Sequence, residues 1–395
     1  MMASRSQVET SISWPILSQL SKNTPFGRPF KHVCQSSLNL FLHRFVKEFI
    51  DSEQGWVTAQ SIIKSLGQFA DLTYDQNLIK CPARYAARLS QAFTATDASV
   101  PVDVEEIQMD RDIYSEDRKY CFTDGVGTVS QELARDIWNE LKRTRKRARK
   151  NKAYPKAFQI RFQGSKGMLS VNHKLTGRLL CLRQSMIKFS APSSTIIEVA
   201  RAFDRPTPYF LNRPLIMLLD GLGVPFEAFK YYQDLAIQQT QKSVSSNDTA
   251  ARMLESYGLG TSYAVPSVLL QLHKRGIRDL LSNTFWKKAM DFAVYHVLRE
   301  LKNHSRIPIP GAWTLVGVAD EHNYLEEGEI YACVKPPTGR TIYLEGDILI
   351  SRSPTIHPGD VQVVRAIGRP PPGSPFDAEP LPNTVVFNTK GALNV

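Results

Sequence analysis

Cysteine is scarce in this sequence, and its spacing excludes two kinds of protein. The 395 residues hold five cysteines, and no two of them form a CxxC pair. Zinc ribbons need closely spaced cysteine pairs, and disulfide-stapled secreted domains need many cysteines in a short chain. The sequence therefore predicts reduced thiols and an intracellular protein, nuclear or cytoplasmic, that is not secreted.

Long apolar runs are also lacking. The most apolar run, PLIMLLDGLGVPF, is short and contains an aspartate. A membrane-spanning helix needs about 20 consecutive apolar residues, so the sequence predicts no transmembrane helix and no membrane partner. The N-terminal stretch has no basic segment followed by an apolar core, so we do not expect a signal peptide.

Positive charge is present mainly in one place. The net charge is +11, but the run KRTRKRARKNK, residues 142–152, carries eight lysines and arginines and no acid, which leaves +3 for all other residues. Such a run is typical of a solvated charged face, a nucleic-acid contact or a nuclear-targeting signal. The overall charge alone therefore does not indicate a nucleic-acid enzyme.

Hydrophobic spacing divides the chain into four regions. We expect residues 1–115 to be mostly helical and residues 116–224 to be β-rich, with a basic helix over 131–152. Helical spacing returns over 225–310 and strand spacing over 311–395. The order predicts an α+β fold with two β-rich units separated by a helical connector. No repeat of fixed period is visible.

Several local features refine this division. Apolar residues in SSLNLFLHRFVKEFIDSE, residues 36–53, have helical spacing, and Ser130 can cap the basic helix. The polar run QQTQKSVSSNDTAA, residues 238–251, predicts a flexible loop between helices. AFQIRFQGSKGMLSV alternates apolar and polar residues and predicts strands around a turn.

The turn in that stretch, FQGSKG, places Lys166 between two glycines. It is compatible with a plain turn, or with a contact in which a phosphate approaches the backbone and the lysine supplies charge. The GxxxxGK[ST] spacing of a Walker A loop is absent. Arg161 precedes the turn and Lys188 follows the next candidate strand, so three cations could converge on one anionic ligand.

The segment SRSPTIHPGD contains more chemistry than a turn requires. Arg352 and His357 could form a structural pair or contact a substrate, and Asp360 could cap the turn. Apolar runs flank the segment on both sides, which predicts a turn between two strands.

Seven segments together resemble the eukaryotic cellular RNA-dependent RNA polymerases, the RNA-silencing polymerases of fungi, plants and nematodes. They are, in the family's order, CPARYAARLSQAFTAT, YCFTDGVGTVS, FQIRFQGSKGMLSV, LRQSMIKFSA, YFLNRPLIMLLDGLGVP, GVADEHNYLEEGEIYACV and GDILISRSPTIHPGDVQVVRAI. They span roughly residues 80 to 390, and seven in order are far more specific than any one of them.

The resemblance implies a double-psi β-barrel polymerase core. A first barrel would lie within 116–224 and the incomplete start of a second within 311–395, joined by the helical connector. It also implies that Arg161, Lys166 and Lys188 face nucleotide and RNA phosphates, and that Arg352 and His357 lie near the catalytic loop. Candidates for contacts to the RNA backbone come from the basic run: Lys142, Arg143, Arg145, Lys146, Arg147, Arg149 and Lys150.

The chain departs from the family at the metal site. The family carries a DxDGD loop that holds Mg²⁺ for nucleotidyl transfer, with nucleoside triphosphates as substrates, single-stranded RNA as template and double-stranded RNA as product. No such loop occurs here, and the acids after Asp360 are Asp377 and Glu379. We therefore expect a C-terminally truncated polymerase that is inactive alone.

Two alternatives stay open at this point. One is a non-catalytic remnant that binds RNA, and the other is a non-functional half-barrel with unpaired strand edges. A relative of the DNA-dependent RNA polymerase large subunit fits the first motifs less well. Protein partners cannot be inferred from the sequence.

Overall fold

The computed structural model describes residues 48–51, 55–58, 81, 83, 96–144, 154–188, 195–260, 263–277, 283–336 and 339–391. The chain divides into two compact units. The first unit comprises the chain up to Pro206 together with Leu315–Ile348 and Val364–Val395, and the second comprises Thr207–Thr314 and Leu349–Val363.

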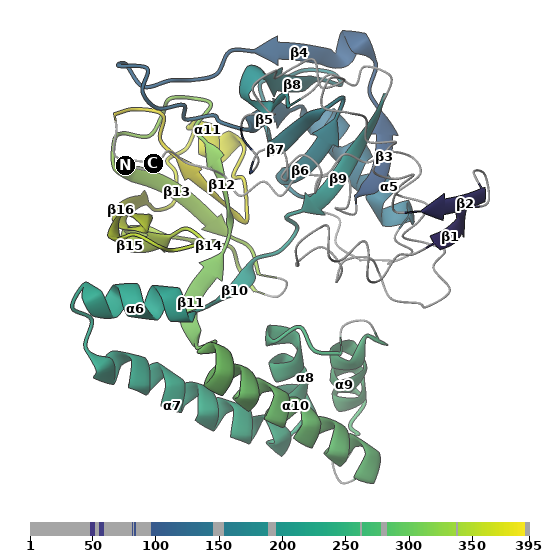
Figure 1. The fold of residues 1–395 in the computed structure, drawn as a ribbon, viewed down its shortest axis with the longest axis vertical. Coiled ribbons are helices and arrows are strands. Elements are labelled where there is room, and N and C mark those ends of the chain that lie inside the picture. Colours follow the sequence, from purple (N-terminus) through teal and green to yellow (C-terminus); the bar gives the residue numbers. More distant parts are fainter. Residues whose placement is uncertain are drawn as a thin grey trace. The chain divides into compact units, whose positions relative to one another are not determined.

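A seven-stranded sheet is the centre of the first unit (Figure 1). Its strands, in spatial order, are β3 (Asp97–Pro101), β9 (Ile196–Ala202), β6 (Ala157–Phe162), β7 (Ser165–Val171), β5 (Val126–Val129), β8 (Leu180–Arg183) and β4 (Ile107–Asp110). The predicted alternation over β6 is confirmed, because Phe158, Ile160 and Phe162 are all buried. Arg161, on the opposite face of that strand, is buried as well.

Helix α5 (Gln131–Thr144) packs on this sheet. Ser130 caps it as predicted, since its Oγ accepts a hydrogen bond from the Leu133 N–H at 3.3 Å. The helix buries Leu133, Ile137 and Leu141, which recur at helical spacing, and leaves its polar face exposed.

A six-stranded sheet forms the second β-rich region. It contains β12 (Val316–Ala319), β17 (Thr384–Phe387), β13 (Glu329–Val334), β16 (Val361–Ile367) and β15 (Glu345–Ser351) in that order, and β14 (Ile342–Tyr343) pairs with β13. The short helix α11 (Pro375–Ala378) places Phe376 against Tyr331, with the two rings stacked 4.5 Å apart.

The two sheets repeat one pairing pattern. In the first sheet β4 is parallel to β8, β5 is parallel to β7, and β5 is antiparallel to β8. In the second sheet β12 is parallel to β17, β13 is parallel to β16, and β13 is antiparallel to β17. The repeat is one of topology, so a search for repeating residues does not find it.

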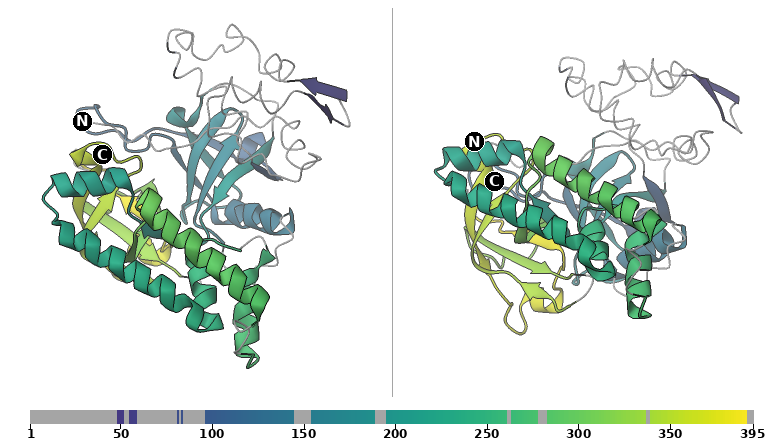
Figure 2. Two further views of the ribbon diagram at one scale, coloured as in Figure 1. Left: turned by 60° about the horizontal axis from the view of Figure 1, so that its bottom comes forward. Right: turned by 90° about the horizontal axis from the view of Figure 1, so that it is seen from below.

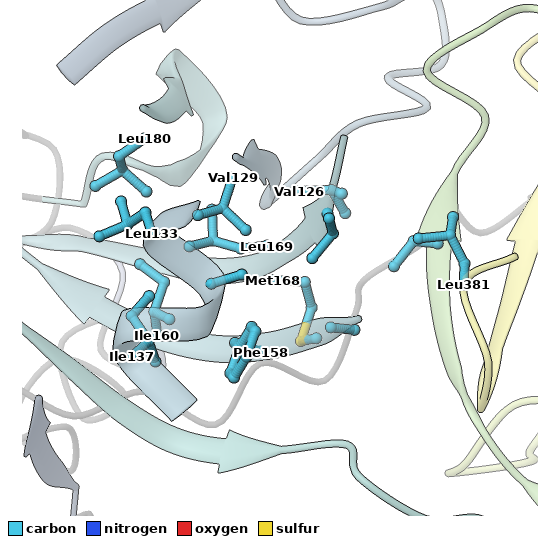
Figure 3. Close-up of a cluster of buried hydrophobic side chains, with 14 of the residues drawn as sticks. Val126, Val129, Leu133, Ile137, Phe158, Ile160, Met168, Leu169, Leu180 and Leu381 are labelled. Carbon is cyan, nitrogen blue, oxygen red and sulfur yellow. The ribbon is translucent and has the colours of Figure 1, made fainter. Parts of the chain in front are cut away.

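One hydrophobic core joins residues of both sheets. Side chains from α5 and from β5, β6, β7 and β8 meet in the cluster drawn in Figure 3. Val318, Tyr331 and Val386 of the second sheet belong to the same cluster. Burial of about 25 cal/mol per Å² of apolar surface is what holds such a core together.

The second unit is built mainly from helices. They are α6 (Arg213–Gly221), α7 (Phe226–Lys242), α8 (Asn247–Ser256), α9 (Val265–Lys274) and α10 (Thr284–His304), and they accompany a strand pair, β10 (Thr207–Phe210) with β11 (Pro308–Thr314). Helices α7 and α10 run side by side (Figure 2). Met290, Ala293, Val297 and Leu301 of α10 enter the core of this unit.

Two predictions of secondary structure are wrong. The loop expected over 238–251 is instead the end of α7, the 3₁₀ turn Ser243–Ser245 and the start of α8, because Ser246 caps α8 by accepting from the Thr249 N–H. The polar residues are there to cap a helix and cover its outer face.

The mostly helical N-terminal region is wrong where the structure describes it beyond single residues. Strand β1 (Glu48–Asp51) pairs antiparallel with β2 (Gly55–Thr58), so the helix expected through residue 53 does not extend over these positions. β3 and β4 pair with strands roughly 70 to 100 residues later, which local spacing cannot reveal. Within the described parts of the chain, no helix combines the length and apolar character that crossing a bilayer requires.

Candidate nucleic-acid interface

The FQGSKG segment is a tight hairpin between β6 and β7. Phe162 pairs with Ser165, and the two residues between them, Gln163 and Gly164, have φ values of 47° and 83°. Positive φ at both central positions defines a type I′ turn, which matches the twist of antiparallel strands. The predicted turn is thus confirmed, and Gly164 is needed for its backbone conformation.

The second glycine of the segment has a packing role. A Cβ atom on Gly167 would lie 2.1 Å from the carbonyl oxygen of Gly125, which is in the FTDGVG loop. The space beside Gly167 is therefore filled by the protein's own backbone. Both glycines are explained without a bound phosphate, so any case for a ligand depends on the cations.

The structure brings the three predicted cations of the first unit to one end of the seven-stranded sheet. Arg161 and Lys166 are directly opposite in the β6–β7 ladder. The Lys188 N–H donates to the Gly164 carbonyl at 3.1 Å, beside the turn. Lys166 and Lys188 are half-buried, whereas only 4% of Arg161 is exposed.

Arg161 has a buried acidic neighbour. Glu198 on β9 lies directly opposite Arg161, so the two side chains share a face of the sheet. Burial raises the pKa of Glu198 to about 7, although a hydrogen bond from Thr96 and the charge of Arg161 both act to lower it. Arg161 thus balances a buried carboxyl group behind the two lysines.

A polar network fixes the loop that faces Lys188. The Asp112 carboxylate accepts hydrogen bonds from the Ser185 hydroxyl at 2.6 Å, the Ser185 N–H at 3.0 Å and the Thr123 hydroxyl at 3.0 Å. The Ser185 oxygen in turn accepts from the Gly125 N–H at 3.1 Å, and Lys188 Nζ donates to the Ser185 carbonyl. The Asp124-containing loop and the Lys188 segment are thereby held together.

A buried ion pair links the two sheets at the same place. Arg183, at the end of β8, donates from both terminal nitrogens to Glu321, which follows β12, at 2.9 and 2.7 Å. The same guanidinium donates to the backbone carbonyls of Arg111 and Val126. Only 4% of the Arg183 side chain and 12% of the Glu321 side chain are exposed.

The sequence reading missed Arg183, Glu321, Asp112 and Ser185 as parts of this region. Arg183 and Ser185 lie inside the segment LRQSMIKFSA that carries part of the resemblance, which was the available signal. Glu321 lies 138 residues from its partner, and no local pattern indicates such a pairing.

Arg352 and His357 belong to the second unit, in the SRSPTIHPGD turn. Asp360 caps this turn, since its Oδ2 accepts from the N–H groups of Ile356 and His357, both at 2.8 Å. These backbone hydrogen bonds lower the pKa of Asp360. His357 Nδ1 accepts from the Gly359 N–H at 3.0 Å, and the Arg352 N–H donates to the Asp360 carbonyl. Much of the segment's chemistry therefore shapes the turn.

The basic run is described only at its start. Lys142 and Arg143 lie in the last turn of α5, and Arg143 forms an exposed ion pair with Glu140 at 2.8 Å. Arg145, Lys146, Arg147, Arg149 and Lys150 lie outside the described residues.

A magnesium site was tested against the side chains present. Mg²⁺ binds clustered oxygen ligands, mainly carboxylates. Across the described ranges, no three His, Cys, Asp or Glu side chains are grouped so that they could hold a metal ion. Asp320, the buried acid after β12, uses its carboxylate to accept from the N–H groups of His322, Tyr324 and Leu325. These residues do not fit the metal, and no metal-dependent step is assigned to them.

Comparison with known proteins agrees with the resemblance. The family model described as RNA dependent RNA polymerase matches residues 22–395. The chain is 30% identical over 391 residues to the probable RNA-dependent RNA polymerase 1 of Oryza sativa subsp. japonica, which covers 97% of this chain and 48% of that protein.

Relatives from other organisms match in the same way. RNA-dependent RNA polymerase 1 of Arabidopsis thaliana is 30% identical and covers 85% of this chain and 28% of its own length. RNA-dependent RNA polymerase 1 of Schizosaccharomyces pombe is 28% identical, with 86% and 28% covered. The chain thus spans less than half the length of these relatives.

Among solved structures, the chain resembles the RNA dependent RNA polymerase QDE-1 from Thielavia terrestris. The TM-score is 0.59 and the sequence identity is 19%, and the match covers 77% of this chain and 35% of that chain. At this identity the likeness concerns the fold, and it confirms the predicted α+β polymerase architecture.

Proposed function

The chain belongs to the RNA-dependent RNA polymerase family, and we propose that it acts in the copying of single-stranded RNA into double-stranded RNA for RNA silencing. The reaction is nucleotidyl transfer, in which the 3′ oxygen of the growing strand bonds to the α-phosphorus of a nucleoside triphosphate and pyrophosphate leaves. Phosphoryl transfer depends on positioning and on charge stabilisation.

The observation that carries this proposal is the gathering of Lys166 and Lys188 at the β6–β7 hairpin. Half-buried ammonium groups beside a fixed loop are suited to hold phosphate oxygens of RNA or nucleotide. Arg161 supports them from the buried face, where its charge is balanced by Glu198. Arg352 and His357 keep their predicted role as substrate contacts only as part of this proposal.

We assign phosphate binding, and not catalysis, to these 395 residues by themselves. Magnesium, when bound by the family's DxDGD loop, would supply charge stabilisation, and this sequence contains no such run. A primer-extension assay with template, triphosphates and magnesium tests the assignment. We expect no incorporation above a control without protein, and clear incorporation would contradict it. The intracellular location stays a prediction.

A binding assay tests the lysines. We expect Lys166→Gln with Lys188→Gln to weaken the binding of a short labelled single-stranded RNA. Each lost phosphate contact lowers the salt dependence, log Kd against log salt, by about 0.7 for a single strand. The pair should therefore reduce that slope by about 1.4.

The matched control removes the same charge elsewhere. Lys119→Gln with Lys242→Gln takes two lysines from an exposed turn and from the end of α7. This control should leave both the affinity and the salt slope nearly unchanged. Equal losses in the two double variants would show a non-specific charge effect and would contradict the assigned site.

A further inference from the structure

Helix α10 of the second unit carries an exposed stripe that its own unit does not use. The helix buries Met290, Ala293, Val297 and Leu301 on one side. The opposite side presents six residues at alternating spacings of three and four, which we call the α10 stripe: Phe285, Lys288, Phe292, Tyr295, Arg299 and Lys302. Figure 1 shows α10 along the length of this unit.

The aromatic members of the stripe are unusually exposed. Phe285 and Phe292 are each 71% exposed and Tyr295 is 62% exposed. Large aromatic side chains normally bury most of their surface, and an exposed row of them marks an interaction site. From Phe285 to Lys302 the stripe spans roughly 26 Å at 1.5 Å per residue.

The charges of the stripe indicate what covers it. Lys288, Arg299 and Lys302 alternate with the aromatic residues, are exposed, and are joined by no acid among the six. Asp291 lies at the edge of the stripe. An apolar protein surface would place three cations in a poor environment, whereas a single-stranded nucleic acid offers flat bases for the rings and phosphates for the cations.

We propose that the α10 stripe binds single-stranded nucleic acid by base stacking on Phe285, Phe292 and Tyr295, with phosphates held by the three cations. The choice of RNA over DNA rests on the proposed function. The site is separate in sequence from the lysines at the β6–β7 hairpin, and its binding should depend on unpaired bases. A duplex hides its base faces and should gain less from the stripe.

The test uses the full chain with the substitutions Phe285→Ala, Phe292→Ala and Tyr295→Ala combined. All three side chains are exposed and alanine favours helices, so the fold should persist, and circular dichroism checks this. We expect affinity for single-stranded RNA to fall roughly tenfold or more, because stacking on each aromatic residue is worth about 1–3 kcal/mol. Affinity for duplex RNA should change much less.

A matched control is Tyr231→Ala on α7. Tyr231 is 64% exposed, similar to Tyr295, but has no place in the stripe. Its loss should leave RNA affinity unchanged. An RNA containing 4-thiouridine should crosslink to the α10 peptide, and the same probe in deoxyribose form shows whether DNA is held equally.

The outcomes separate this inference from the proposed function. Loss of binding in the Lys166 and Lys188 variant, with none in the aromatic variant, would overturn the stripe and leave the proposed function intact. A wild-type chain that forms dimers, which the aromatic variant breaks without any change in RNA affinity, would identify the stripe as a protein interface and overturn the inference. Loss in the aromatic variant alone would support the stripe while contradicting the hairpin site.

Discussion

The two sheets of the first unit share a strand-pairing pattern and differ in the loops that follow the same strand. After β4 of the first sheet, Asp112 binds Ser185 and Thr123 within its own sheet. After β12 of the second sheet, Glu321 reaches Arg183 of the first sheet. Each carboxylate lies two residues beyond its strand, and both serve the segment that leads from β8 to Lys188.

This difference shows how one frame supports two tasks. Strand pairing satisfies the backbone in both sheets and leaves the loop side chains free to differ. In the first sheet they gather cations around a hairpin. In the second sheet they fix its first loop to the first sheet, while Asp320 organises that loop through backbone N–H groups.

The largest effect should come from breaking the link between the sheets. Arg183→Met leaves Glu321 partly buried without its partner, and it frees the carbonyls of Arg111 and Val126. Removing one member of a buried ion pair costs about 3–5 kcal/mol. Urea unfolding should show a loss of that size in the free energy of unfolding.

The control for this prediction is an exposed arginine. Arg143→Met removes a side chain that is 79% exposed and pairs with Glu140, and such surface pairs contribute little. If Arg183→Met is as mild as Arg143→Met, the ion pair does not hold the two sheets together.

The sequence predicts the parts of this comparison that depend on local order. The alternation of Phe158, Ile160 and Phe162 and the glycine at position 164 are enough to place the hairpin. The seven ordered motifs are enough to indicate the polymerase fold. Both signals are carried by residues close together in the chain or by a resemblance along its whole length.

The remaining features depend on partners that are distant in sequence. Arg161 occupies a polar position in its strand, yet it is buried because β9, nearly 40 residues later, covers it with Glu198. β3 and β4 lack a strong strand pattern and gain their hydrogen bonds from β9 and β8. The common pairing pattern of the two sheets leaves no repeating residues to find.

A medium effect is expected when the second sheet's loop loses its organiser. Asp320 is fully buried and accepts three backbone hydrogen bonds. Asp320→Asn removes the charge and turns one acceptor into a donor that faces N–H groups. Hydrogen bonds to charged groups contribute about 1.5–3 kcal/mol each, and part of this is retained by the amide oxygen, so we expect a loss of about 2–3 kcal/mol.

Amide exchange measured by mass spectrometry locates that loss. Protection should fall over residues 320–325 and change little over the Asp112 loop of the first sheet. Equal loss of protection in both loops would mean that the two sheets respond as one unit, and the proposed separation of their tasks would then be wrong.

The smallest effect concerns Glu198, which lies on the first sheet beside Arg161. Burial raises the pKa of Glu198 to about 7 in the folded protein, whereas a glutamate in an unfolded chain has a pKa of about 4.3. Between these values the folded state binds more protons than the unfolded state. The stabilising contribution is therefore fully present below the unfolded pKa and is lost as pH rises toward 7.

Glu198→Gln removes this proton linkage and so tests it. Between pH 5.5 and pH 8 the wild-type chain should lose about 1–2 kcal/mol of unfolding free energy through Glu198, at about 1.4 kcal/mol per pH unit inside the titration range. The variant should lose correspondingly less over the same interval, whatever its absolute stability. Urea unfolding at several pH values measures the difference between the two slopes. Parallel slopes would mean that Glu198 stays ionised beside Arg161, and the guanidinium would then be held by a permanent charge pair behind Lys166.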